Sequence, residues 1–373
     1  MTDRTPCDDS SAMQIVLLTE RHYQDWNDFC LESDGAWFFH TTDWLVYTLN
    51  YRPELAGESK SFFVTDGSRM LAICPLILET HLQGEDRFKE FSYSGSFGVT
   101  PALVNDLSEK YRSKLFKRVF NHVDNLALQN EVQRMSIQCS PLIPSFLGSC
   151  LPQSNWLLRY GMADVSVSSH IIDLSADVAS LMRHMRSDVR KNIRRASRRL
   201  EVEIFDHENV SLGVFDQYRE MHHRAAGKVT RPLVTFEMMY EWIQRGFAVL
   251  FGARLAGEFV GFYFVIVYKS RAISGSSCRD VNHLKLPIGH FLNWEIVRWL
   301  KERGFQYYTT GIQQYGWLPH NFPSAKEVNI AAAKRGLGGY VIPCFHGEKF
   351  YSRDYYLQVT KDRMEYFGSA LPT

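Results

Sequence analysis

The spacing of hydrophobic and polar positions predicts a β-hairpin at two places in the chain. Residues 61–79 form a short strand pattern, a turn signal at Asp66-Gly67 and a longer apolar strand pattern. Residues 248–268 repeat that order, with the turn at Ala256-Gly257. The repeat indicates that the two halves of the chain share an architecture.

The elements that follow each hairpin also repeat in the order strand, helix, strand. We expect them at residues 91–94, 108–128 and 134–138 in the first copy, and at residues 272–277, 287–303 and 305–310 in the second. The pattern predicts two α+β domains in tandem, each a mixed, mostly antiparallel sheet flanked by helices. Their expected bounds are 1–165 and 166–373.

The predicted helix at residues 287–303 has clear start and stop signals. Pro287 stands at its first turn and Gly304 follows its basic end. Gly289 lies in the first turn, where unpaired backbone N–H groups can receive a phosphate. An alternative is that Gly289 only allows close packing against a strand.

Residues 175–200 predict a single amphipathic helix whose apolar stripe includes Val189 and Ile193. The other faces are basic, with eight Arg and Lys residues between positions 183 and 199 against the single Asp188. Helix faces that only contact solvent usually mix charges, so Arg190, Lys191 and Arg194 are predicted to bind an anionic donor. A solvent-exposed face paired with distant acids is the alternative.

The composition describes an ordinary globular protein. The chain has 373 residues, 42 Lys and Arg against 41 Asp and Glu, and seven scattered cysteines without metal-ligand spacing. No apolar run is long enough to span a bilayer, and the polar start does not resemble a secretory signal. We therefore expect a cytoplasmic protein without metal, permanently bound cofactor or integral membrane contact. The oligomeric state stays open.

Three segments resemble FemABX-like transferases of the GNAT superfamily. They are LMRHMRSDVRKNIRRASRR at residues 181–199, HLKLPIGHFLNWEIVRWLKERGFQYYTTG at residues 283–311, and AKRGLGG at residues 333–339, where Ala333 replaces the family's phenylalanine. In the N-terminal half, FFHTTDW at residues 38–44 and FSYSGS at residues 91–96 are similar to the family's opening turn and its ligand-facing strand. The resemblance implies two GNAT-like acyltransferase domains, with the donor site in the second.

The resemblance implies an N-acyltransferase that moves an acyl or aminoacyl group to an amine acceptor, such as an amino sugar or amino acid, in cell-envelope or exopolysaccharide synthesis. Acyl-CoA is the favoured donor. The alternative is a tRNA-dependent aminoacyltransferase that acts on a peptidoglycan-like precursor. The segment after Trp44 lacks a basic residue for a nucleotide-sugar diphosphate, which disfavours a muropeptide acceptor.

Acyl transfer to an amine mainly requires positioning and a group that stabilises the oxyanion. Lys334, in the glycine-rich motif, is the predicted electrostatic residue, and His290 is a candidate base. Gly289 and Gly338 are expected to contact the donor. The residues expected to bind the acceptor are His40, Trp44, Tyr93, Arg224, Tyr315 and Trp317. The competing class, a non-enzymatic RNA-binding protein, would use the basic helix, but the rest of the chain is net acidic.

Overall fold

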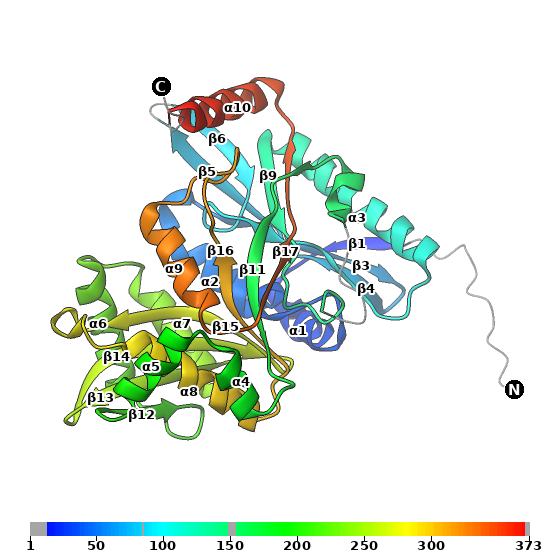
Figure 1. Ribbon diagram of the computed structural model, residues 1–373. Helices are drawn as coiled ribbons and strands as arrows, with labels where there is room; N and C mark the ends of the chain where they lie inside the picture. The colour runs from blue at the N-terminus through cyan, green and yellow to red at the C-terminus, as the bar shows by residue number, and fades with distance from the viewer. Residues whose placement is uncertain (1–12, 84–85, 148–153, 370–373) are drawn as a thin grey trace, which may run out of the picture. The chain divides into compact units, whose positions relative to one another are not determined.

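The computed structural model describes residues 13–83, 86–147 and 154–369, which form two compact units (Figure 1). Unit 1 contains residues 1–49, 53–163 and 347–352. Unit 2 contains residues 50–52, 164–346 and 353–373. Unit 1 therefore takes a short segment from near the C-terminus. The segment supplies most of a strand to the unit 1 sheet.

Unit 1 has two sheets. The smaller has the order β1 (Gln14–Leu17), β3 (Phe62–Asp66), β4 (Arg69–Cys74), β8 (Ala102–Leu103). The larger has the order β10 (Ala163–Asp164), β18 (His346–Phe350), β9 (Val132–Gln138), β6 (Asp86–Phe91), β5 (Ile77–Gln83), β2 (Glu58–Ser59), and β7 (Gly98–Val99) also pairs with β9. Its helices are α1 (Tyr23–Glu32), α2 (Thr42–Tyr51) and α3 (Glu109–Gln129).

The first predicted hairpin forms, but its second strand is divided. The turn lies at Asp66-Gly67, and Gly67 has a φ of 57°. The apolar run after the turn becomes β4 in the smaller sheet and β5 in the larger, with Pro75 and Leu76 between them. Proline cannot donate to a ladder, so the strand changes sheets at this point. The prediction of one long strand was wrong.

A row of charged side chains crosses the larger sheet of unit 1. Arg134 on β9 contacts Glu90 on β6, Nε to Oε1 at 2.8 Å, and Glu348 on β18, Nη1 to Oε1 at 3.1 Å. Beside Glu90, the Glu79 carboxylate on β5 accepts hydrogen bonds from the backbone N–H groups of Ser94 and Gly95. The three carboxylates are buried, so the pairing is needed to offset their lost hydration.

Unit 2 is built on one seven-stranded sheet. Its order is β12 (Leu200–Phe205), β13 (Ala248–Leu255), β14 (Glu258–Tyr268), β15 (Arg271–Arg279), β16 (Tyr307–Gln313), β11 (Val167–Asp173), β17 (Tyr340–Cys344). The helices are α4 (Val178–His184), α5 (Ser187–Ala196), α6 (Leu212–Ala226), α7 (Leu233–Gln244), α8 (Ile288–Glu302), α9 (Ala325–Arg335) and α10 (Arg353–Gly368). The second hairpin is confirmed as β13 and β14, with its turn at Ala256-Gly257.

Alternate side chains of β14 pack against helices on opposite faces of this sheet. Tyr263 and Val265 belong to the core that packs α4, α5 and α8 on one face (Figure 1). Phe262 and Phe264 contact Tyr218 of α6 on the other. Side chains that alternate across a strand produce this two-sided burial, which explains the continuous apolar run of β14.

The basic stretch forms two helices instead of the single helix predicted. α4 begins after Asp177, whose side chain accepts the Ser180 N–H, and the chain leaves the helical conformation at Met185. α5 begins two residues later, and the Arg186 N–H donates to the carbonyl of Gly336, far along the chain. This long-range bond competes with the local helical bond, and Leu200 is already in β12.

Candidate donor site

The parallel strands β15 and β16 pair only at their beginnings. Residues 271–273 pair with residues 307–309, after which β15 stays with β14 and β16 stays with β11. The chain connects the two strands through α8, whose first turn lies at the open end of the pair. An opening between parallel strands beside a helix N-terminus is a common position for an anionic ligand.

A cavity of about 760 Å³, here called the α8 cavity, lies at this position. Its apolar wall includes Phe262, Ile288 and Leu292. Its lining contains five cationic side chains and no carboxylate; the cations are Arg195, Arg279, Lys285, Lys326 and Lys334. None of the five forms an ion pair with a residue in the described parts of the chain. The α8 cavity is therefore suited to an anionic ligand that also carries an apolar group.

Lys334 extends from the last turn of α9 toward β16. Its Nζ would lie 3.6 Å from a Cβ placed on Gly311, which follows the bulge in β16. Burial lowers the pKa of its ammonium, which has no hydrogen-bond acceptor among the residues described. A partly desolvated, unpaired cation is available to stabilise a phosphate or a developing oxyanion.

His290 lines the same cavity from the first turn of α8. The Asn192 side-chain amide lies 3.3 Å from its Nδ1, and burial lowers the pKa of the imidazole. A neutral ring that accepts from the amide at Nδ1 carries its proton on Nε2. In that tautomer Nε2–H is a hydrogen-bond donor, and the role of His290 as a base stays a prediction.

Gly289 also lines the α8 cavity, and a Cβ placed on it would meet no atom within 4 Å. The alternative of close strand packing at Gly289 is therefore wrong. Close packing occurs instead at Gly261 of β14, where a Cβ would lie 2.6 Å from the Ile288 side chain. Gly289 thus leaves open space beside the positive end of the helix dipole.

The three predicted donor-binding cations of α5 have different surroundings. Arg190 donates hydrogen bonds to the carbonyls of Arg183, at 2.9 Å, and Met185, so it stabilises the end of α4. Lys191 and Arg194 are exposed and do not line the α8 cavity. Arg195, which the sequence analysis did not assign to the donor, lines the α8 cavity. The break at Met185 sets which face of α5 packs against α8.

The glycine-rich motif shapes the backbone between α9 and β17. Gly338 and Gly339 have φ values of 83° and 78°. A Cβ on Gly339 would lie 2.2 Å from the Ile171 carbonyl, and the Gly338 carbonyl accepts a hydrogen bond from His170 Nε2. Gly338 does not line the α8 cavity, so its predicted donor contact is replaced by a role in the turn.

The three predicted acceptor residues of unit 1 are mostly buried. His40 is fully buried: its Nε2–H donates to the Thr100 carbonyl and its Nδ1 accepts the Trp37 N–H. Trp44 stacks on Tyr47 at 5.1 Å. Tyr93 is 6% exposed, and burial raises the pKa of its hydroxyl. Both ring nitrogens of His40 are occupied, so we no longer assign this side chain to ligand binding.

The remaining predicted acceptor residues lie in unit 2. Arg224, in the last turn of α6, is exposed and pairs with Glu220 at 3.7 Å. Tyr315 and Trp317 line a cavity of about 600 Å³ after β16. Tyr315 is 61% exposed under the Arg335 guanidinium, while Trp317 packs on Phe322 and Tyr366. Exposed aromatic faces of this kind suit sugar or base stacking.

Sequence reasoning missed four cations of the α8 cavity: Arg195, Arg279, Lys285 and Lys326. Of these four residues, Lys285 was the easiest to predict from the sequence, because it stands two positions before Pro287, at the start of the predicted helix. Arg279 at the end of β15 and Lys326 in the first turn of α9 line one cavity only because the fold brings these two elements to it. The described residues contain no His, Cys, Asp and Glu group able to hold a metal ion, and none of their helices is both long and apolar enough to cross a membrane.

Comparison with known proteins agrees with this geometry. Residues 183–317 match the model of the acetyltransferase (GNAT) domain. The fold is similar to that of FemX, with a TM-score of 0.64, 12% identity, and coverage of 93% of this chain and 100% of FemX. No curated protein matches the sequence significantly.

Two further solved structures share the fold. The C-terminal domain of a putative lysylphosphatidylglycerol synthetase from Agrobacterium fabrum has a TM-score of 0.56, 12% identity, and coverage of 91% of this chain and 95% of that one. A tandem GNAT protein from the clavulanic acid biosynthesis pathway has a TM-score of 0.52, 14% identity, and coverage of 91% and 99%.

The match places an acetyltransferase (GNAT) domain at residues 183–317, within unit 2. Over most of its length the chain shares the fold of FemX and of a tandem GNAT protein, which is the fold that its resemblance to FemABX-like transferases implied. The predicted α+β fold class is likewise confirmed.

Proposed function

We propose that the protein is an N-acyltransferase that binds an acyl-CoA thioester in the α8 cavity and transfers the acyl group to an amine. The observation that carries this proposal is the lining of five unpaired cations without a carboxylate, beside an apolar wall. CoA combines phosphates with an acyl-pantetheine arm, so both parts of the lining have a partner. The first turn of α8 adds unpaired N–H groups for a phosphate.

In the proposed reaction, the neutral acceptor amine attacks the thioester carbonyl carbon. The new C–N bond forms, the oxyanion collapses, the C–S bond breaks and CoA leaves as thiolate, which takes up the proton that the amine nitrogen releases. In this proposal Lys334 stabilises the oxyanion and His290 donates a hydrogen bond to the acyl donor, and the support is that both side chains line the α8 cavity. Catalysis thus relies on positioning and electrostatics more than on a covalent intermediate.

The acceptor is proposed to be an amino sugar or an amino acid of cell-envelope or exopolysaccharide synthesis. The exposed ring of Tyr315 supports a sugar-bearing acceptor. The putative lysylphosphatidylglycerol synthetase domain and FemX share only the fold with this chain, so their names do not specify its acceptor. A cytoplasmic location stays a prediction from the sequence.

A second candidate donor is aminoacyl-tRNA, with a peptidoglycan-like acceptor. The observation in its favour is a set of exposed cations on and just after α5 that lie outside the α8 cavity: Lys191, Arg194, Arg198 and Arg199. None has an ion-pair partner in the described chain, and CoA need not reach them. A longer polyanion would use them. Binding RNA without catalysis is not supported, because residues 183–317 match an acetyltransferase domain.

The test compares binding of CoA and of alanyl-tRNA by calorimetry, together with turnover on a panel of amino sugars and amino acids. Arg195→Gln with Lys285→Gln should weaken CoA binding at least ~10-fold, since each change removes a cation from the cavity. Arg303→Gln is the matched control, because it removes a cation at the opposite end of α8, roughly 20 Å away.

Loss of tRNA binding but not CoA binding in a Lys191→Gln, Arg194→Gln variant, with turnover only of alanyl-tRNA, would favour the second donor. Equal CoA affinity in the Arg195, Lys285 and Arg303 variants would exclude the α8 cavity as the donor site.

A further inference from the structure

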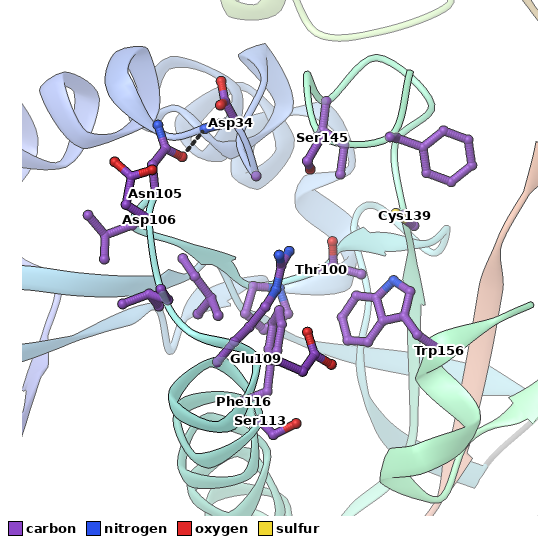
Figure 2. Close-up of a pocket in the computed structure, with 18 of the residues that line it drawn as sticks. Asp34, Thr100, Asn105, Asp106, Glu109, Ser113, Phe116, Cys139, Ser145 and Trp156 are labelled. Atoms are coloured by element: carbon purple, nitrogen blue, oxygen red, sulfur yellow. Dashed lines mark hydrogen bonds between the residues drawn. The ribbon is translucent and has the colours of Figure 1, made fainter. Parts of the chain in front are cut away.

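Unit 1 has a cavity of about 440 Å³ at the position that corresponds to the α8 cavity in unit 2. α3 connects the parallel strands β6 and β9, as α8 connects β15 and β16. The second cavity, here called the α3 cavity, lies beside the first two turns of α3 (Figure 2). Its other walls come from the segment after β9 and from the short helix Trp156–Tyr160.

The charges of the α3 cavity differ from those of the α8 cavity. Its lining has two arginines, Arg112 and Arg159, and three acids, Asp34, Asp106 and Glu109. Three carboxylates near the helix N-terminus repel a ligand with several phosphates. The α3 cavity is therefore not a second copy of the proposed donor site.

Arg112 lines the α3 cavity from the first two turns of α3. Its guanidinium carbon lies 5.9 Å from the centre of the Phe116 ring. Burial raises the pKa of the Cys139 thiol to about 12, and the positive charge of Arg112 opposes this rise. Neither Arg112 nor Arg159 forms an ion pair or a side-chain hydrogen bond with the residues described. Both guanidinium groups thus have unused donors for an anion.

Part of the lining is apolar. Phe116, Cys139 and Phe146 are buried side chains of the lining. Thr100 is 1% exposed, and its hydroxyl has no hydrogen-bond partner among the residues described, although its carbonyl accepts from His40. Figure 2 shows Thr100, Cys139 and Trp156 around the same opening. The Thr100 hydroxyl is therefore available to a ligand in the cavity.

We propose that the α3 cavity is a second ligand site, for a small carboxylate that carries an apolar or aromatic group. The carboxylate pairs with Arg112, the apolar group lies beside Phe116 and Trp156, and the Thr100 hydroxyl donates to the ligand. The volume lies in the lower part of the range for small-molecule sites, roughly 300–1,000 Å³. The acids Asp34, Asp106 and Glu109 also accommodate an ammonium, so free apolar amino acids belong to this class.

The experiment measures binding to the full-length protein by calorimetry with three probes of similar shape. 3-Phenylpropanoate carries only the carboxylate, phenylalaninamide only the amine, and L-phenylalanine both. We expect saturable binding of 3-phenylpropanoate and at least ~10-fold weaker binding of phenylalaninamide, because only the carboxylate pairs with Arg112. Tighter binding of L-phenylalanine than of 3-phenylpropanoate would support the site and assign the amine to its acids.

Arg112→Gln should weaken both carboxylate probes at least ~10-fold, and Thr100→Val by a smaller factor. Lys117→Gln, on the same helix but outside the cavity, and Lys334→Met, in the α8 cavity, should leave binding unchanged. Circular dichroism checks that each variant is folded. The proposal is overturned by no saturable binding of either carboxylate, by equal binding in Arg112→Gln, or by loss of binding in Lys334→Met.

Discussion

Lys334 combines two properties that rarely occur together in a residue kept only for stability. Its ammonium is partly buried, and no residue described pairs with it. Burial of an unpaired charge costs free energy of folding. A lysine in this situation is typical of sites where charge is needed by a ligand or a transition state.

Lys334→Met should therefore separate function from stability. We expect kcat/KM to fall at least ~10-fold, about 1.4 kcal/mol of transition-state stabilisation, while the melting temperature stays equal or rises. Burial lowers the pKa of Lys334 below the ordinary value for a lysine. The wild-type rate should therefore fall as pH rises through this lowered pKa, because the ammonium then loses its charge. Because a depressed lysine pKa means that the unfolded chain binds more protons in that interval, wild-type stability gains with pH there.

Steady-state kinetics and thermal melting against pH check both parts of this prediction. Lys334→Arg is the control, since it keeps the charge. A Met variant with parental kcat/KM would remove Lys334 from the reaction.

At the scale of elements, one residue in the first turn of α8 affects both the stability of the helix and the space in the α8 cavity. Gly289 is an intrinsically poor helix residue, and nothing occupies the space that its side chain would fill. Gly289 thus weakens the first turn of α8 at the position where this turn lines the α8 cavity. Such a local conflict is typical of a functional position.

Gly289→Ala should stabilise α8 by roughly 0.5–1 kcal/mol, because alanine loses less backbone entropy. The same methyl group lies in the cavity, so KM for the donor should rise several-fold. Thermal melting and donor titration measure the two effects. Gly304→Ala is the contrasting variant: Gly304 has a φ of 77°, so alanine there should destabilise the helix end without changing KM. An unchanged donor KM in Gly289→Ala would contradict the predicted contact.

The sequence predicted elements well where their signals were local. The caps of α3 and α8 and the Ala256-Gly257 turn are set by neighbouring residues. The break between α4 and α5 was not predictable, because it depends on the bond from Arg186 to Gly336. Lys334, His290 and Gly289 were predicted largely because they lie in the segments that resemble the family. Arg279 and Lys326 were not predicted as cavity residues, because only the arrangement of the sheet brings them to the α8 cavity.

At the scale of the whole molecule, the two units differ in how much of the chain each must assemble. Unit 1 depends on β18, which lies between β10 and β9 in its sheet. Beyond the contact from Glu348 to Arg134, Lys349 pairs with Asp124 at 2.8 Å, and the Tyr351 hydroxyl donates to the same carboxylate. The segment thus closes an edge of the sheet and neutralises charges of unit 1.

A fragment of residues 1–163 should consequently be aggregation-prone or melt at a lower temperature than unit 1 in the full chain, because β9 has an open edge and Arg134 loses one of its two acids. Joining residues 346–352 to residues 1–165 through a short Gly-Ser linker should restore solubility. Glu348→Gln in the joined chain should restore it less. Size-exclusion chromatography and thermal melting test the series, and a soluble, cooperatively folded 1–163 fragment would refute the prediction.

The late position of β18 also orders the events of protein synthesis. The ribosome completes residue 163 long before residue 352, and at ordinary elongation rates the interval is about 10–40 s. During that time β9 is exposed to other nascent chains. Unit 1, which is translated first, therefore stays incomplete until near the end of synthesis, and we expect it to be the part of this protein that depends most on chaperones.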